Sequence, residues 1–260
     1  MAQVTAKRTL PLAISLLMAL VGVTAARAMA PIGENPCEAP EAKVLLCPNL
    51  RIGPPRELYV DRVSDRTRLH ATSDVRSRGR GPMELHGTRN GWRTMRVRQR
   101  IYRAGGGHIT VPTRATLRFT SVGSYFGGSY WKVHRLARFE LWSVDAQRRL
   151  LHRVRVGPKL NYCLRDLERT RPGKRSPTHW HYPGCNQDPY IHHDTLGTSV
   201  GWSDIYPADY DKQWINASGL RGCFAFVMTV DPEGLLNESN EHDNSSRRLV
   251  HLPFRGDNGC

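Results

Sequence analysis

Apolar and polar residues alternate in short stretches along most of the chain. Val97, Gln99 and Ile101 alternate with arginines, and residues 137–142 place Ala, Phe and Leu on one face. A period of two is typical of a β-strand with one buried face. Residues 223–230 are apolar on both faces, which predicts a strand inside a packed sheet.

Turn signals separate these stretches, and no helical stripe of ordinary length stands out. The turns are rich in Gly, Pro, Asn and Asp and fall at residues 78–82, 90–91, 105–107 and 231–234. Many short strands with frequent turns predict an all-β fold, a single β-sandwich with long loops. One of these loops, residues 169–181, is basic and contains proline.

The N-terminal residues resemble an export signal. Lys7 and Arg8 precede an apolar run over residues 10–23, and Ala26-Arg27-Ala28 offers a cleavage site. We expect residues 1–28 to be a signal peptide that leaves no stable membrane span after cleavage, with an uncleaved anchor as the alternative. Residues 29–56, rich in Pro, Glu and Ala, are expected to form a loosely ordered arm, and residues 57–260 the sandwich domain.

All six cysteines follow the signal. An even number of cysteines in an exported chain points to disulfides and a secreted or extracellular location. Six cysteines permit 15 pairings, so the sequence does not settle the connectivity. Short spacing favours Cys37–Cys47 and Cys163–Cys185, which leaves Cys223–Cys260.

The chain is strongly basic, with 38 Lys and Arg against 23 Asp and Glu. Cleavage after Ala28 removes three basic residues and no acidic one, so the mature chain keeps an excess of 12 positive charges. This charge favours an acidic extracellular or cell-surface polymer or protein as partner. The arginines at 96–100 alternate with apolar residues, as on a solvated strand face, and no motif indicates a specific nucleic acid.

The segment from Val200 to Ala217 is aromatic and acidic, and it places Tyr206 between Ile205 and Pro207. It resembles the segment of the lysyl oxidases that carries the tyrosine converted into their quinone cofactor. The resemblance extends from about Leu50 to Pro253. Further matching stretches are Gly81–Leu85, Met95–Tyr102, Leu136–Leu141 and Gly219–Pro232.

The resemblance implies roles for two residues. Lysyl oxidases oxidise a primary amine to an aldehyde with copper and a quinone made by joining a lysine to a modified tyrosine. Lys159 falls where the family's cross-linking lysine lies, and Tyr206 falls where its quinone precursor lies. Both halves of a lysyl-tyrosyl quinone are therefore present.

The copper ligands implied by the resemblance are replaced. The family holds copper with a His-x-His-x-His strand, a spacing that puts three imidazoles on one face. The matching positions here are Gly128, Tyr130 and Lys132, none of them a good copper(II) ligand. Without the metal, Tyr206 is expected to stay an ordinary phenol.

Two other sets of residues are possible metal ligands. A rebuilt copper site would draw on other histidines, and the candidates are His108, His134, His179, His181, His192 and His193. The loop from Asp231 to Asp243 is rich in oxygen donors and is a weaker candidate for calcium, although a plain hairpin turn explains it better.

The sequence thus predicts an exported pseudoenzyme of lysyl-oxidase descent, with no cofactor expected and a surface or extracellular binding role. The alternative is an oxidoreductase, a copper- and quinone-dependent amine oxidase with an unorthodox metal site. A hydrolase ranks last, since no pair of catalytic carboxylates is found.

Overall fold

The computed structural model describes residues 1, 34–122, 128–256 and 260. The chain divides into two compact units, Met1–Pro31 and Ile32–Cys260. Apart from Met1, the expected signal peptide lies outside the described residues. Among the residues described, no helix is both long and apolar enough to cross a membrane.

Antiparallel strands make up the second unit, as the alternating pattern predicts, and the single 3-10 helix in the described part is η1 (Pro40–Val44). The first sheet has the order β11-β5-β6-β7-β8, with β1 also paired to β6. Its strands are β1 (Leu45–Leu46), β5 (Met83–Gly91), β6 (Thr94–Arg103), β7 (His108–Ser121), β8 (Ser129–Val133) and β11 (His193–Thr198).

Two further sheets complete the sandwich. The second has the order β10-β9-β14-β15, and the third is built around β4, which pairs with four other strands. The strands of the second are β9 (Ala137–Val144), β10 (Leu150–Val156), β14 (Gly222–Val230) and β15 (Ser245–Leu252). Those of the third are β2 (Leu50–Ile52), β3 (Arg56–Val63), β4 (Arg66–Ser77), β12 (Ser203–Tyr206) and β13 (Trp214–Asn216).

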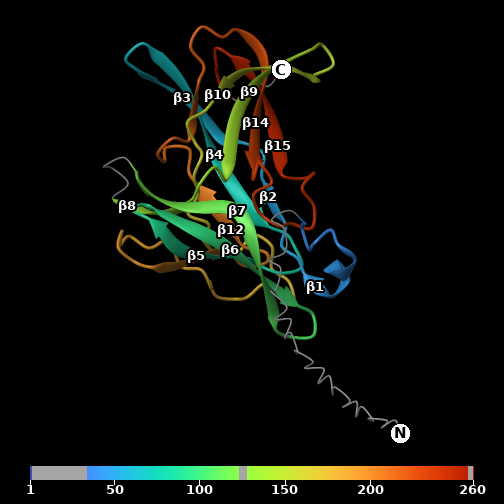
Figure 1. The fold of residues 1–260 in the computed structure, drawn as a ribbon. Helices are drawn as coiled ribbons and strands as arrows, with labels where there is room; N and C mark the ends of the chain where they lie inside the picture. Colours follow the sequence, from blue (N-terminus) through green and yellow to red (C-terminus); the bar gives the residue numbers. More distant parts are fainter. Residues whose placement is uncertain (2–33, 123–127, 257–259) are drawn as a thin grey trace. The chain divides into compact units, whose positions relative to one another are not determined.

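One hydrophobic core joins the three sheets. Leu69 of β4, Leu117 of β7 and Phe226 of β14 are fully buried members of the same cluster. In Figure 1, β4 runs from the strands β9 and β10 toward β5–β8, so it connects the two groups of strands. Burial of this apolar surface is the main stabilising contribution to the fold.

The region expected to be a loosely ordered arm differs from that expectation. From residue 34 onward it contributes η1, β1 and β2, and Leu45 pairs with Arg103 of β6. Leu45 and Leu50 are completely or almost completely buried. Short apolar pairs inside a Pro- and Glu-rich stretch are enough to join this segment to the sheets, because each strand needs only two or three residues.

All three disulfides favoured by cysteine spacing are present. They are Cys37–Cys47, Cys163–Cys185 and Cys223–Cys260. Cys163–Cys185 spans the long connection between β10 and β11, which also contains Lys159. This bridge therefore restrains the loop that carries one half of the candidate site.

Candidate functional site

Lys159 and Tyr206 are 47 positions apart in sequence but touch in the fold. Tyr206 is the last residue of β12 and pairs with Ser73 of β4, whereas Lys159 lies in the loop after β10. The Lys159 Nζ atom is 3.8 Å from the centroid of the Tyr206 ring. Both side chains are buried. The structure thus brings the two residues together, and their role as quinone precursors stays a prediction.

A box of tyrosines surrounds the Lys159 amine. Nζ lies 4.6 Å from the ring centroid of Tyr162 and 5.2 Å from that of Tyr210. The Tyr206 ring meets both other rings edge to face, with centroid separations of 4.7 and 4.9 Å. Electron-rich ring faces stabilise a cation at such distances. Sequence reasoning missed Tyr162 and Tyr210 as site residues, although both lie within four positions of a residue it had assigned.

Hydrogen bonds hold the two halves of this box in place. The Cys163 backbone N–H donates to the Tyr206 hydroxyl at 3.0 Å, and the Leu164 N–H donates to an Asp204 carboxylate oxygen at 3.2 Å. Because Cys163 belongs to the disulfide with Cys185, the covalent bridge fixes the loop that orients the phenol.

Burial sets the protonation states at the site. It lowers the pKa of the Lys159 amine well below its usual range, and the charge of Lys132 lowers it further. It raises the pKa of the Asp204 carboxyl to about 7, against the opposite effects of Arg165 and Lys159. Burial also raises the pKa of the Tyr206 phenol well above its ordinary value. At neutral pH, Tyr206 is therefore a protonated phenol.

Two of the three positions that the resemblance aligns with the family's copper ligands share a face of β8, as strand alternation predicts. Tyr130 pairs with Thr120, and Lys132 pairs with Arg118 of β7. The third position differs from the expectation, because β8 begins at Ser129 and Gly128 lies just before it. Gly128 has φ +110°, a conformation that other residues rarely adopt. A histidine there would strain the backbone at a cost of roughly 1–3 kcal/mol.

The amine of Lys132 is buried among aromatic rings. Its Nζ lies 4.3 Å from the ring centroid of Tyr130 and 5.9 Å from that of Tyr210, whose ring also flanks Lys159. Burial lowers the pKa of Lys132 to about 8, while Asp211 acts to raise it. The protonated, positively charged form of the Lys132 amine therefore predominates at neutral pH.

These side chains do not fit copper(II). Glycine offers no ligand, a neutral phenol is a poor one, and an ammonium has no lone pair to donate and repels a dication. The donor set at the three positions is thus chemically unlike the three imidazoles that the resemblance implies.

In the part of the chain that the structure describes, the candidate histidines do not converge on a common point. The His134 Nδ1 atom lies 3.0 Å from the Asn161 side-chain oxygen, and burial lowers the pKa of this imidazole. Five others are exposed: His108, His179, His181, His192 and His193. Within the described residues, the one group of three His, Cys, Asp or Glu side chains with converging ligand atoms contains no histidine.

A cavity of about 440 Å³ adjoins Tyr206. Three of the site's tyrosines and the Cys163–Cys185 bridge contribute to its wall, and Arg165 is the one cationic residue among its lining. The lining residues are Tyr130, Cys163, Arg165, Leu167, Gly184, Cys185, Gln187, Ile205, Tyr206, Pro207 and Tyr210. Aromatic walls with a single guanidinium suit a small ligand that has an apolar part and a negative group.

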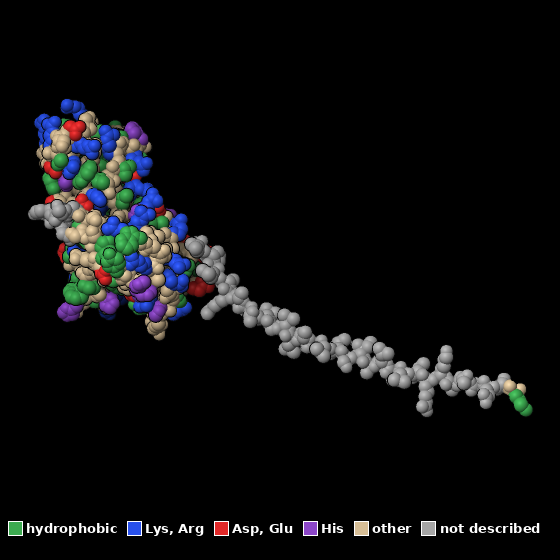
Figure 2. Space-filling model, turned by 60° about the vertical axis from the view of Figure 1, so that its left-hand side comes forward, with side chains coloured by type: hydrophobic (Ala, Val, Ile, Leu, Met, Phe, Trp, Pro, Cys, Tyr) green, Lys and Arg blue, Asp and Glu red, His purple; other side chains and the backbone are tan. Residues whose placement is uncertain are grey.

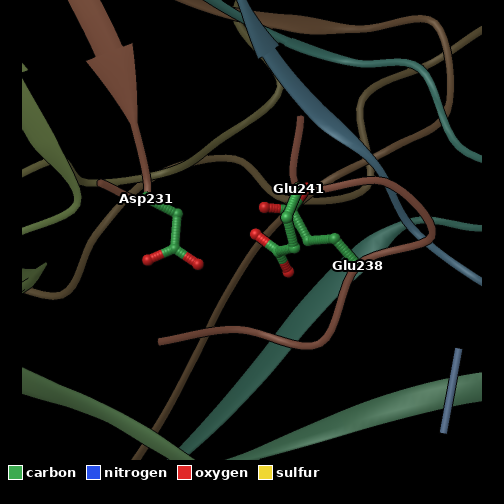
Figure 3. A group of neighbouring side chains, drawn as sticks. All are labelled: Asp231, Glu238 and Glu241. Atoms are coloured by element: carbon green, nitrogen blue, oxygen red, sulfur yellow. The ribbon is translucent and has the colours of Figure 1, made fainter. Parts of the chain in front are cut away.

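The converging acidic group lies in the connection between β14 and β15, where the sequence offers oxygen donors for calcium. Carboxylate oxygens of Asp231, Glu238 and Glu241 lie within 4.8 Å of one another (Figure 3). Burial raises the pKa of Glu238 well above its usual range. Burial also raises the pKa of Glu241 to about 7, with a smaller contribution from the negative charge of Asp231. Oxygen donors of this kind suit calcium better than copper.

Comparison with known proteins agrees with the geometry. The family model described as Lysyl oxidase matches residues 72–256, well over half of the chain. A search of curated proteins finds no match. The matched range contains Lys159, Tyr206 and residues 128, 130 and 132.

Proposed function

Because the chain belongs to the lysyl oxidase family, we propose that it is an exported, lysyl-oxidase-like binding protein that does not oxidise amines. The observation that carries this proposal is the charged, buried Lys132 at a former copper position, with its amine over the Tyr130 ring. In the family, copper supplies the oxidising chemistry that converts the tyrosine into a quinone. Without a site for that ion, Tyr206 and Lys159 remain unmodified neighbours.

The surroundings of Tyr206 support the same conclusion. Oxidation of a phenol is easier for the phenolate, but burial and the nearby Asp204 keep the Tyr206 hydroxyl protonated. The ammonium of Lys132 contributes a positive charge to the β8 face, yet it cannot accept or pass on electrons. The site keeps the family's frame and lacks its redox centre.

A binding role agrees with what the molecule retains. Three disulfides stabilise the domain, as is common in exported proteins. The cavity beside Tyr206 remains open to ligands, and the surface is rich in Lys and Arg, with few Asp and Glu on the face seen in Figure 2. We infer that the partner is acidic.

Copper loading followed by an amine oxidase assay tests the proposal. The secreted protein is incubated with copper(II), freed of excess metal and analysed for bound copper and for peroxide release from a primary amine. We expect neither stoichiometric copper nor amine-dependent peroxide. Stoichiometric copper together with amine-dependent peroxide would refute the proposal.

The second candidate function is amine oxidation with an unorthodox metal site. The 3.8 Å approach of Lys159 to the Tyr206 ring favours it, since the family's cofactor joins these two positions. If this candidate is right, Lys159→Met and Tyr206→Phe each abolish peroxide release. Under the non-catalytic proposal, wild type and both variants give the same background.

A further inference from the structure

The outward face of the first sheet presents a row of arginines. Arg96, Arg98 and Arg100 occupy alternate positions of β6, so their side chains share one face at intervals of about 7 Å. The strand register adds Arg118 of β7, which pairs with Thr94 on the same face. We call these four residues the arginine row. Arg96, Arg98 and Arg118 are exposed.

Hydrogen-bonding side chains flank this row. Arg96 lies between Thr88 of β5 and Thr116 of β7, and Arg98 lies next to His86. These neighbours bring hydroxyl and imidazole groups, which also bind anions and sugar hydroxyls. The flat face therefore offers positive charges separated by neutral polar groups.

Glu84 of β5 lies on this face, and its carboxylate is already paired. Glu84 pairs with Arg100 across the strands, and a Glu84 oxygen lies 3.0 Å from the Arg100 guanidinium. Glu84 is buried and also accepts hydrogen bonds from Tyr102 and Tyr182. Burial acts to raise its pKa, but these hydrogen bonds, His86 and Arg100 lower it overall, so Glu84 stays ionised and committed to its partners. In the described part of the chain, the Arg96 guanidinium has no hydrogen bond or ion pair and is available to a ligand.

Two exposed aromatic rings lie at the Trp92 end of the arginine row. Trp92, in the turn between β5 and β6, is 67% exposed, and Tyr190 is 63% exposed. Their rings meet edge to face with centroids 5.8 Å apart. The Arg89 guanidinium packs over Trp92 and donates to backbone oxygens of Pro189 and Trp92. The pair is thus braced by an arginine while most of its surface stays in solvent, which leaves both rings available to a ligand.

We propose that the arginine row and the Trp92–Tyr190 pair form a binding surface for a carboxylated polysaccharide, a linear polymer of uronic acids. Planar guanidinium groups bind planar carboxylates through two parallel hydrogen bonds. Threonine hydroxyls between the arginines match a chain in which charges alternate with sugar hydroxyls, rather than a densely sulfated polymer. Exposed aromatic rings pack against the apolar C–H face of a sugar ring.

This inference rests on the acidic partner of the proposed function and specifies its chemistry and its surface. It does not depend on the site around Tyr206. A protein that bound the polymer and also oxidised amines would refute the proposed loss of catalysis and leave this inference intact.

The test compares binding of the secreted protein to polygalacturonate, heparin, a duplex DNA and neutral dextran at several salt concentrations. We expect polygalacturonate to bind most tightly, dextran not to bind, and affinity to fall with salt. The double variant Arg96→Ala/Arg98→Ala should weaken polygalacturonate binding by about tenfold or more, since two contacts between a guanidinium and a carboxylate are lost. Trp92→Ala should weaken binding without changing the salt dependence.

A matched control keeps the test specific to this surface. Arg62 and Arg66 are exposed on the β3–β4 hairpin, and Arg62→Ala/Arg66→Ala removes the same charge. The control variant should bind within about twofold of wild type. Equal losses in both double variants, tighter binding of heparin or DNA than of polygalacturonate, or no polygalacturonate binding at low salt would each overturn the proposal. All substituted positions are exposed, and near-ultraviolet circular dichroism verifies that the fold is kept.

Discussion

Replacing Lys132 with methionine removes a buried charge from β8 while keeping an unbranched side chain of similar length. The lowering of the Lys132 pKa from 10.5 to about 8 corresponds to about 3 kcal/mol that disfavours the charged amine in the fold. Loss of the contact between the amine and the Tyr130 ring costs about 1–2 kcal/mol. We therefore expect Lys132→Met to raise the free energy of unfolding at pH 7 by about 1–2 kcal/mol.

The pH dependence separates charge removal from better packing. Between pH 8 and 10.5, folded wild type has released the Lys132 proton while the unfolded chain still holds it, so rising pH stabilises the wild-type fold. Methionine lacks this contribution. Relative to Lys132→Met, wild type should therefore gain up to about 3 kcal/mol of stability across this range.

Urea unfolding monitored by tryptophan fluorescence, with disulfides intact, measures the difference between the two proteins at pH 7, 8, 9 and 10. Other titrating groups largely cancel in this difference. Lys212→Met is the control, because Lys212 is exposed, and it should change stability by less than about 0.5 kcal/mol. Two results would contradict a destabilising charge at Lys132. One is a Lys132→Met protein that is less stable than wild type at pH 7 by more than about 1 kcal/mol. The other is a difference in the free energy of unfolding that stays constant with pH.

Three further experiments address the Cys163–Cys185 disulfide, the β8 positions 130 and 132, and the acidic loop. Cys163→Ala/Cys185→Ala removes a disulfide between residues 22 positions apart. It should lower the free energy of unfolding, measured by urea unfolding, by about 3 kcal/mol, and a loss below about 1 kcal/mol contradicts this. Tyr130→His/Lys132→His places two imidazoles on one face of β8 and should produce a copper(II) electron paramagnetic resonance signal absent from wild type; its absence contradicts the assignment of this face. Calcium should raise Tm by about 2–4 °C at pH 8 and by less at pH 5.5, because the Glu241 pKa of about 7 leaves it protonated in acid. An unchanged Tm, or an equal rise in Glu241→Gln, counts against calcium binding there.

Much of the fold follows from the local pattern of the sequence. The alternation around Val97 and Ile101 predicts β6, and both side chains are buried in it. The doubly apolar run at 223–230 predicts β14, which lies between β9 and β15. Cysteine spacing favours Cys37–Cys47 and Cys163–Cys185, since short loops close at the lowest entropic cost, and Cys223–Cys260 is the pair that remains.

Other features leave no local trace. Gly128 is the first of three alternate positions, 128, 130 and 132, which the sequence pattern places on one strand face. Its φ is positive, and it lies just before β8 rather than in it. The tyrosine box around Lys159 is assembled from β12, the loop after it and the connection between β10 and β11, and side-chain contacts of this kind depend on packing rather than on periodicity. β1 lies inside a Pro- and Glu-rich stretch, where two apolar residues are too few to give a period.

The chemical state of Lys159 and Tyr206 decides whether this protein forms the family's quinone. The secreted protein, produced with copper in the medium, is reduced, digested and mapped by mass spectrometry, and a second sample is treated with phenylhydrazine before digestion. We expect unmodified peptides for both residues and no hydrazine adduct, because Lys132 occupies a position that the resemblance aligns with a copper ligand of the family. A peptide that joins Lys159 to Tyr206, with a phenylhydrazine adduct on Tyr206, would contradict it.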